Sequence, residues 1–591
     1  MNAPAQLRPD GTHAHLIAPD TTGMNVYRAD PALRDLLRIH LPEALFRHIE
    51  PHLDRLGQMV GGPLDEAGRL ADRHVPVLHQ RDKFGRDVQR IEYHPAYREL
   101  ERAAFGEFGI HAMSHRKGIL GWPQTYPVAA KHAFTFLFNQ AEFGMGCPIN
   151  VTDGAAKLLS NYGDVSLKDK YLDGLTQTDM SKLTQGGQFM TEKEGGSDVG
   201  KLTTRAVKDG EHWRLFGEKW FCSNADAEVV MLLARPEGAV SGTKGVGLFL
   251  MPRRLDDGSP NHYRIVRLKD KLGTRSMASG EIKLEGAIAY AVGKLDRGFV
   301  QMAEMVNSSR LSNGVKSTAL MRRAYHDAMT VARGRVVFGQ RIIDMPLARR
   351  QLMKIMLATE QALSMSFLTA DALDRAEAGS QDAAALLRIL TPVLKFRATR
   401  DARKVCGDAM EMRGGVGYIE EFATSRLLRD AHLGSIWEGT GNIVALDALT
   451  RAVRRHGAEA ALAADLHARL DDATSVPAAW RDRLRSLTDR AIGFAREVAA
   501  HADNEADARR ATSSLYHVAS AVALAWEAHR IHPLRGDARR LLLSRLAIDH
   551  RLMAPDPFAV IESAAQKAIT EHLLGERDVG MDEAGRLVMA A

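Results

Sequence analysis

Apolar residues recur at helical spacing through the first third of the chain. Asp30 can cap a helix and Pro31 suits its first turn. Leucines then follow on one helical face, at Leu33, Leu36, Leu37 and Leu41. A largely apolar run over residues 132–143 is long enough for a buried helix. We therefore predict an all-α domain over residues 1–185.

The pattern changes after residue 185 to short β-branched and aromatic runs divided by turn residues. These runs cover residues 212–216, 229–234, 247–251, 263–268 and 281–284. Such short runs predict a compact β domain, which we place at residues 186–295.

Helical periodicity returns from about residue 300. Long runs cover residues 302–334, 347–376 and 382–412, and they predict a helical bundle over residues 296–450. A further helical domain is predicted over residues 451–591, where apolar residues alternate by three and four at Leu484, Leu487, Ala491, Phe494 and Val498. The chain is thus predicted to be α+β, in the order helical, β, helical, helical.

Composition is that of a globular protein. The chain has 591 residues, 45% apolar and 26% charged, and this length suits about three or four domains. The three cysteines, Cys147, Cys222 and Cys406, lie far apart in the sequence. This spacing excludes a disulfide framework and a CxxC zinc or redox site, so we predict no metal site and a reducing, cytoplasmic location.

Neither membrane insertion nor bulk binding of nucleic acid is indicated. No apolar run reaches the roughly 18 residues of a membrane span, and residues 1–15 lack the features of an export signal. Net charge is +6, from 79 Lys+Arg against 73 Asp+Glu. Residues 451–591 carry 20 of each sign, so this part offers no basic tail to hold phosphates.

Four clusters carry candidate chemistry, and the first covers residues 190–198 (Met-Thr-Glu-Lys-Glu-Gly-Gly-Ser-Asp). Adjacent glycines let backbone amides approach an anion, and the hydroxyls of Thr191 and Ser197 can donate to phosphate or to heterocycle carbonyls. A solvated turn has the same composition. The cluster alone therefore leaves both interpretations open.

The second cluster, residues 218–224 (Glu-Lys-Trp-Phe-Cys-Ser-Asn), ends a predicted strand. An aromatic face there can stack on a planar ring while Ser223 bonds the ring edge. The alternative is a core strand that runs into an asparagine turn.

The third cluster joins residues 335–339 (Arg-Val-Val-Phe-Gly) with residues 413–418 (Arg-Gly-Gly-Val-Gly-Tyr). Arg335 offers a fork-shaped donor for pyrophosphate, and Phe338 offers a stacking surface. The glycines fit neither a strand-to-helix GxGxxG fingerprint nor a GxxxxGK[ST] loop, which excludes Rossmann and P-loop sites. A surface ion pair at Arg335 and a helix C-cap at the glycines are the alternatives.

The fourth cluster, residues 434–442, places Glu438 between Trp437 and a glycine on a loop joining two helical runs. If these neighbours exclude water, the pKa of Glu438 rises and the carboxylate becomes a competent base. A simply solvated loop glutamate is the alternative.

These four clusters, in this order and at these separations, resemble the acyl-CoA dehydrogenase family of flavoenzymes over roughly residues 130–450. Residues 141–174 and the predicted hairpin at residues 271–276 are also similar to that family. The chain departs from the family at Lys193-Glu194, at residues 221–223 and at Pro346. These variants, the Trp437 loop and the long C-terminal block resemble the AidB-like branch linked to the alkylation response.

This resemblance implies the family's fold and cofactor. The fold has an N-terminal helical domain, a central β-barrel-like domain and a C-terminal helical bundle, here with an extra C-terminal helical block. FAD would lie between the β domain and the bundle. Phe221 would pack on the isoalloxazine ring, Ser223 would bond flavin N5, and Thr440 and Asn442 would close the site beyond the base. The first cluster would contact the flavin ring and the pyrophosphate through Met190, Thr191, Gly196 and Ser197.

The same resemblance implies a homo-oligomer, a dimer or a tetramer. A set of residues would hold the adenosine pyrophosphate of a neighbouring subunit's FAD, namely Arg335, Phe338, Glu411, Gly414 and Gly415. Arg310 and Glu438 would contact the substrate. Some relatives carry their base one residue before the arginine that corresponds to Arg310, but this position is Ser309, so the base falls on Glu438.

We therefore expect α-proton abstraction by Glu438 and β-hydride transfer to flavin N5, which converts an acyl-CoA thioester to trans-2-enoyl-CoA. An electron-transfer flavoprotein is the expected acceptor. The alternative function is a DNA-associated alkylation-response flavoprotein with weak dehydrogenase activity, although the neutral C-terminal block disfavours it. An acyl-CoA oxidase is a lesser rival, and a nitroalkane-oxidising relative would be expected to carry aspartate at the base position.

Overall fold

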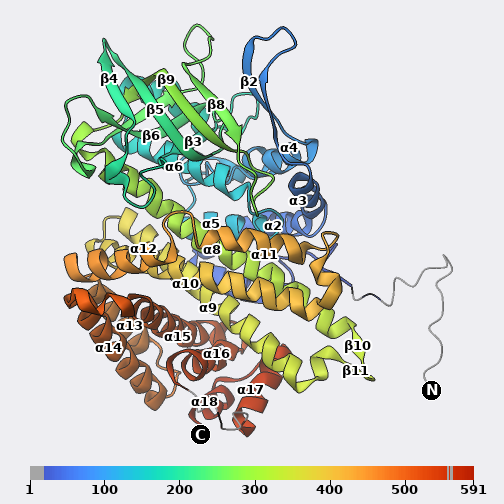
Figure 1. The fold of residues 1–591 in the computed structure, drawn as a ribbon. Helices are drawn as coiled ribbons and strands as arrows, with labels where there is room; N and C mark the ends of the chain where they lie inside the picture. The colour runs from blue at the N-terminus through green and yellow to red at the C-terminus, as the bar shows by residue number, and fades with distance from the viewer. Residues whose placement is uncertain (1–16, 18, 555–557, 559–562, 591) are drawn as a thin grey trace, which may run out of the picture.

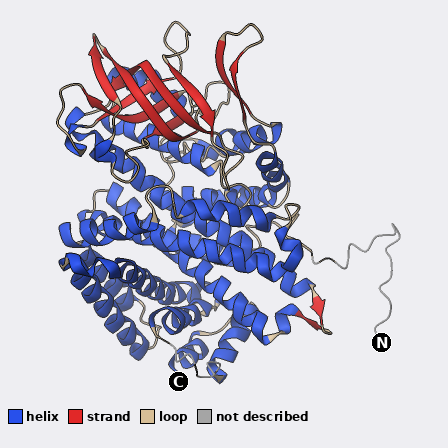
Figure 2. Cartoon of the chain, in the orientation of Figure 1, coloured by secondary structure: helices blue, strands red, loops and turns tan. Residues whose placement is uncertain are grey.

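The computed structural model describes residues 17, 19–554, 558 and 563–590. Most β strands gather at one end of the molecule, and layers of helices fill the rest (Figure 1). Figure 2 shows the same division by element type, with the strands at the top of the view. Residues 1–15, on which the expectation of no export signal rests, lie outside the described residues.

The N-terminal region is built mainly of helices that begin where the sequence pattern places them. In α1, the Asp30 side chain accepts a hydrogen bond from the Leu33 backbone N–H at 3.1 Å, as a helix cap requires. The helices are α1 (Pro31–His40), α2 (Glu43–Val60), α3 (Pro63–Arg73), α4 (Pro95–Glu101), α5 (Val128–Phe138), α6 (Gly146–Tyr162) and α7 (Val165–Leu175). The buried run at residues 132–143 is helical only as far as Phe138.

The prediction that residues 1–185 are all-α is wrong at one place. A two-stranded antiparallel hairpin, β1 (Val77–Arg81) and β2 (Asp87–Glu92), projects beside the main sheet (Figure 2). Its turn is closed by Asp82, whose carboxylate accepts from the backbone N–H groups of Phe84 and Arg86 at 2.8 and 3.0 Å. The strands are largely exposed and rich in charge, so they lack the apolar alternation that predicts a half-buried strand.

The central β domain is a barrel-like sheet. Its strands are β3 (Gly186–Phe189), β4 (Arg205–Asp209), β5 (His212–Ser223), β6 (Val229–Pro236), β7 (Gly247–Pro252), β8 (Tyr263–Leu268) and β9 (Ser279–Ala291). Pairings run from β6 through β4, β5, β9 and β7 back to β6, which closes a ring, while β3 pairs with β6 and β8 pairs with β9. All five predicted runs are strands, and β5 and β9 extend well beyond the predicted ends.

Long helices below the sheet form the bundle. They are α8 (Gly298–Gly334), α9 (Pro346–Glu377), α10 (Gln381–Arg413), α11 (Ala423–Gly434) and α12 (Gly441–Leu446), with a short hairpin of β10 (Val336–Val337) and β11 (Gln340–Arg341) after α8. The three long runs predicted from the sequence correspond to α8, α9 and α10. Helix α8 packs against both α9 and α10 and also reaches α6 below the sheet, so it joins the bundle to the site region.

The C-terminal block consists of α13 (Ala458–Asp472), α14 (Ala478–Ala500), α15 (Ala508–Arg535), α16 (Arg539–Ala547), α17 (Ala564–Leu574) and α18 (Met581–Met589). The predicted apolar face of α14 is buried or packed on the core at all five positions. Helix α15 packs against α9 and α10, so the block shares one continuous apolar core with the bundle.

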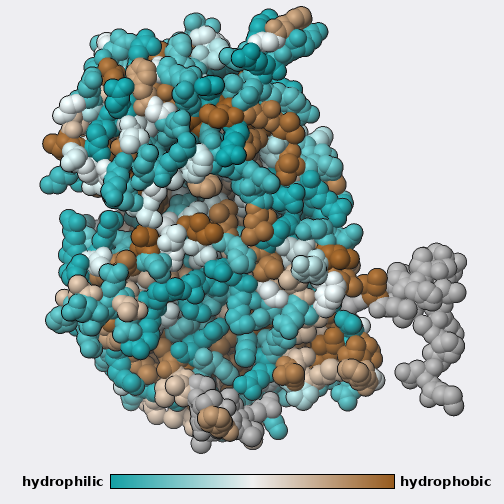
Figure 3. All heavy atoms as spheres, in the orientation of Figure 1, coloured by the Kyte–Doolittle hydropathy of each residue, from teal (hydrophilic) through white to brown (hydrophobic). Residues whose placement is uncertain are grey.

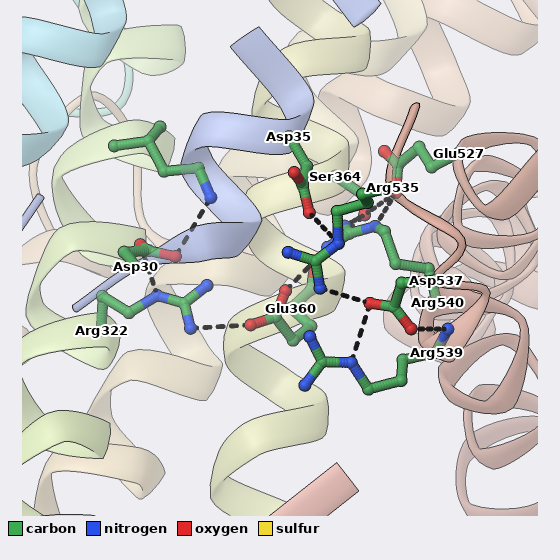
Figure 4. A network of polar contacts seen from close by, with 11 residues as sticks. Asp30, Asp35, Arg322, Glu360, Ser364, Glu527, Arg535, Asp537, Arg539 and Arg540 are labelled. Atoms are coloured by element: carbon green, nitrogen blue, oxygen red, sulfur yellow. Dashed lines mark hydrogen bonds and ion pairs between the residues drawn. The ribbon is translucent and has the colours of Figure 1, made fainter. Parts of the chain in front are cut away.

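Buried charges reinforce that contact. Arg540 on α16 pairs with Glu360 of α9 at 3.0 Å and with Glu527 of α15 at 2.6 Å. Glu360 also pairs with Arg322 of α8 at 2.7 Å, and Arg322 pairs with Asp30 at 3.0 Å (Figure 4). This network joins the block to the helices that it covers.

Within the described part of the chain, no helix combines the length and the apolar character needed to span a lipid bilayer.

Candidate active site

Glu438 lies on the loop between α11 and α12. Its φ is +56°, and Gly439 follows at +98°, so two consecutive residues adopt the left-handed conformation that non-glycine residues rarely take. The side chain is partly buried, and its carboxylate has no hydrogen-bond or ion-pair partner among the described residues. Burial raises the pKa of Glu438, while the charges of Lys316, Lys395 and Arg310 act in the opposite direction.

The main chain of this loop is held through its carbonyl groups. Arg310 Nε of α8 donates to the Glu438 carbonyl oxygen at 3.1 Å, and Lys395 Nζ of α10 donates to the Gly439 carbonyl oxygen. Arg310 is itself fixed by Asp447, whose carboxylate lies 2.6 Å from Nη1. The backbone N–H of Glu438 has no acceptor among the described residues. The loop is therefore rigid, with one backbone donor left available.

Lysines on two helices flank the carboxylate, and the sequence analysis missed both. Lys316 and Lys395 are buried, and burial lowers the pKa of each, that of Lys395 to about 7. Lys316 Nζ lies 4.7 Å from the Trp437 ring centroid, and Trp437 stacks on Phe143 at 5.5 Å. The sequence holds one signal for them, since each lysine is a positive charge within a stretch of apolar or small residues.

The first two sequence clusters lie side by side. The backbone N–H of Trp220 donates to the Thr191 carbonyl oxygen at 2.8 Å. Glu192 is buried between them and accepts from Lys219 Nζ at 2.6 Å and from the Thr204 hydroxyl at 2.5 Å. Phe221 has a φ of +49° and is 59% exposed, so its ring faces away from the β-domain core.

The second and fourth clusters meet at Cys147, at the start of α6. Burial raises the pKa of the Cys147 thiol, and Ser223 of the second cluster and the charges of Lys316 and Glu438 also act on that pKa. Met190 and Trp437 pack against the apolar cluster that contains Cys147. The structure thus brings three of the four clusters together where the β domain meets the helices, and the space-filling surface is notched above α12 in this view (Figure 3).

These converging residues fit a flavin nucleotide. Thr191 and Ser197 have no side-chain hydrogen bond in the described chain, so their hydroxyls are free to bind a ligand. A Cβ added at Gly196 would meet no atom within 4 Å, which leaves open space beside the backbone. Together with the exposed Phe221 ring, the site offers free donors, an open glycine and an aromatic face.

The third cluster is assembled, but it lies far from Glu438. Arg335 Nη1 donates to the Arg413 carbonyl oxygen at 3.4 Å and lies beside Gly414. Phe338 is 98% exposed with a φ of +51°, and Glu411 and Gly415 are also exposed. Arg335 follows the last residue of α8, and the 1.5 Å rise per residue separates it from Arg310 by about 37 Å. The third cluster therefore lies far along α8 from the loop that Arg310 contacts.

Thr440 and Asn442 begin α12 and are exposed. Thr440 has no side-chain hydrogen bond in the described residues. The Asn442 side-chain oxygen accepts from Arg509 Nη1 of α15 at 3.3 Å. A residue of the C-terminal block thus reaches the loop beside Glu438, which the sequence did not predict.

Three sequence families match successive parts of the chain. The N-terminal domain of the adaptive response protein AidB matches residues 17–181. The middle domain and the C-terminal domain of acyl-CoA dehydrogenase match residues 187–287 and 296–454. These matches and the observed elements confirm the predicted fold class, while the domain limits at residues 186, 296 and 451 remain predictions.

Individual relatives agree with this assignment. Acyl-CoA dehydrogenase family member 11 of Caenorhabditis elegans is 36% identical, over 72% of this chain and 70% of that protein. The putative acyl-CoA dehydrogenase AidB of Escherichia coli is 36% identical, over 67% of this chain and 73% of that protein. A crystal structure of Caenorhabditis elegans ACDH-11 in complex with C11-CoA superposes with a TM-score of 0.83 at 29% identity, covering 93% of this chain and 95% of that one. The chain therefore belongs to the acyl-CoA dehydrogenase family, whose members are FAD-dependent oxidoreductases acting on acyl-CoA.

Proposed function

We propose that this protein dehydrogenates an acyl-CoA thioester between Cα and Cβ to give trans-2-enoyl-CoA, with Glu438 as the base that removes the α-proton. The observation that supports this most directly is the Glu438 carboxylate itself. It has no partner in the described residues, burial raises its pKa, and it lies where three of the four clusters meet. A free and desolvated carboxylate is a stronger base than a solvated one.

The loop supplies the second requirement of the reaction. An α-proton of a thioester is only weakly acidic, so the carbonyl oxygen must be polarised as the proton leaves. The backbone N–H of Glu438 is free to donate to that oxygen, because Arg310 and Lys395 hold only the carbonyl side of the loop. Lys316 and Lys395 favour the ionised form of the base.

We assign the cofactor contacts within one subunit to the converging clusters. Met190, Thr191, Gly196 and Ser197 would hold the flavin ring and pyrophosphate. Phe221 would pack on the isoalloxazine ring, Ser223 would bond N5, and Thr440 and Asn442 would close the site. When bound, FAD supplies the acceptor for the β-hydride.

The remaining cofactor contacts would come from a second copy. Arg335, Phe338, Glu411, Gly414 and Gly415 would hold the adenosine pyrophosphate of the neighbouring subunit's FAD. Their distance from Glu438 supports this assignment. An electron-transfer flavoprotein is the proposed electron acceptor.

A reduction assay tests the proposal. Purified holoprotein should be yellow and should lose its flavin colour anaerobically with at least one acyl-CoA of a panel that includes medium chain lengths, since the Caenorhabditis elegans structure contains C11-CoA. Glu438→Gln should retain FAD and lower the reduction rate about 10²- to 10⁴-fold, because general-base catalysis contributes this much. Glu99→Gln, an exposed substitution on α4, is the control. The absence of reduction by every acyl-CoA would contradict the proposal.

The match of residues 17–181 to the AidB N-terminal domain supports one alternative, an alkylation-response flavoprotein that associates with DNA. We favour the dehydrogenase because residues 451–591 carry equal numbers of acidic and basic groups. Salt-sensitive binding to duplex DNA at physiological ionic strength, without reduction by acyl-CoA, would favour the alternative.

A further inference from the structure

Three arginines gather beside the loop that carries Glu438. Arg400 and Arg403 lie on α10, and Arg509 lies at the start of α15 in the C-terminal block. Arg509 Nη1 donates to Asn442 Oδ1 at 3.3 Å, and Arg403 Nη1 donates to the Ser435 hydroxyl at 3.4 Å. A Cβ added at Gly441 would lie 3.8 Å from Arg400 Nη1. All three guanidinium groups thus border residues 435–442.

These arginines have no carboxylate partner within the described residues. Their neighbours do, since Arg397 pairs with Asp401 at 2.5 Å and Arg510 pairs with Asp507 at 3.4 Å. Burial and the positive charges of Arg509, Arg397 and Arg403 lower the pKa of Arg400. A group of like charges without an anion is unfavourable by itself, so a bound anion would relieve the repulsion.

We propose that Arg400, Arg403 and Arg509 form a phosphate-binding site for the pyrophosphate of an ADP-containing ligand. The inference deepens the proposed function, on which it rests, because FAD and acyl-CoA both carry an ADP moiety and both would enter this region. Arginine suits the role, since its planar fork donates two hydrogen bonds to phosphate and remains charged at neutral pH.

The site gives the C-terminal block a part in ligand binding. Helix α15 is fixed against the bundle by its packing on α9 and α10 and by the Ser364 hydroxyl of α9, which donates to Glu527 at 2.9 Å. Arg509 therefore lies on a helix whose position is fixed by its packing, although Arg509 is distant in sequence from the other residues of the site. A chain that ended near residue 450 would lack this arginine.

Ligand affinity tests the site without requiring turnover. We would compare wild type, Arg509→Gln, the double variant Arg400→Gln/Arg509→Gln, and the control Arg510→Gln, whose arginine is adjacent in sequence but paired with Asp507. One arm measures FAD release from the full-length holoprotein by the gain of free-flavin fluorescence. The other arm measures equilibrium binding of an acyl-CoA and of the matching acyl-pantetheine, which lacks the ADP moiety.

A loss of about tenfold in affinity per arginine is expected for one ADP-containing ligand, because hydrogen bonds to charged groups contribute this much. A fall in FAD affinity identifies the flavin pyrophosphate. A fall for acyl-CoA with none for acyl-pantetheine identifies CoA. The proposal is overturned if neither affinity changes or if Arg510→Gln causes an equal loss. The measurement of FAD affinity needs no turnover. If acyl-CoA failed to reduce the flavin, the proposed function would be contradicted, but the FAD measurement would still test the arginine site.

Discussion

Asp430 on α11 is a buried acid that links the bundle to the β domain. Its carboxylate accepts from the Thr274 backbone N–H at 2.6 Å. Burial, with the nearby negative charges of Asp72 and Glu142, raises its pKa to about 7. Because the folded pKa exceeds the unfolded value of about 3.9, this carboxyl costs the protein stability as pH rises from about 4 to 7.

Asp430→Asn should therefore stabilise the protein at pH 8 and stabilise it much less at pH 4.5. The amide keeps an oxygen that can accept from Thr274 but carries no charge. The gain is expected to reach a few kcal/mol at most, since one pKa unit corresponds to about 1.4 kcal/mol. Urea unfolding midpoints at the two pH values measure it, with the exposed Asp169→Asn on α7 as control. A variant less stable than wild type at pH 8 would show that the ionised form is the favoured one.

The residues around Glu438 show which part of the site could be predicted from the sequence and which part could not. The motif places Glu438 beside Trp437 because these residues are adjacent in the chain. Lys316 and Lys395 are distant in sequence and approach the loop only because α8 and α10 cross below it. No local pattern specifies such a crossing, although a buried lysine in an apolar stretch signals an unusual environment.

The attachment of α16 depends on Arg540. Its guanidinium lies between Glu360 and Glu527, and Ser364 accepts from it at 2.6 Å (Figure 4). Arg540→Leu should lower the free energy of unfolding by about 3–5 kcal/mol, because it leaves the buried Glu527 without a cation and Glu360 with Arg322 alone. Chemical denaturation of the holoprotein measures the loss.

Arg490→Leu on α14 is the matched control, since Arg490 is exposed. Adding Glu527→Gln to Arg540→Leu should recover part of the loss, because one buried charge is removed with its partner. If the double variant were no more stable than Arg540→Leu, the network would contribute packing and not charge compensation.

The long helices could be predicted closely, and the exposed hairpin could not. Helices α8, α9 and α10 bury enough side chains for their apolar spacing to be visible in the sequence. The hairpin of β1 and β2 buries little, so its strands carry charges on both faces and resemble loop segments. The β5 and β9 ends were missed for a related reason, since glycines and charges interrupt their apolar runs.

The length of α8 separates Glu438 from the third cluster. Arg310, beside the loop of Glu438, lies in the first half of α8, and Arg335 of the third cluster follows its last residue, about 37 Å away. Apolar side chains are exposed around the far end, with Phe338 98%, Leu347 82% and Tyr418 77% exposed. Figure 3 shows hydrophobic residues gathered at that corner of the molecule. An exposed apolar patch beside the third cluster, for which we propose nucleotide binding, fits an interface with a second copy.

A complementation experiment tests whether two copies share each site. Protein with Arg335→Glu should bind FAD weakly, and protein with Glu438→Gln should bind FAD but lack the base, so each alone should be nearly inactive. Coexpression should restore activity, since one site of a mixed dimer has Glu438 from one subunit and Arg335 from the other. For random dimers the recovery should be about one quarter of wild type, because half of the dimers are mixed and each has one intact site. If Arg335 served the FAD of its own subunit, each site would keep one defect and mixing would restore nothing.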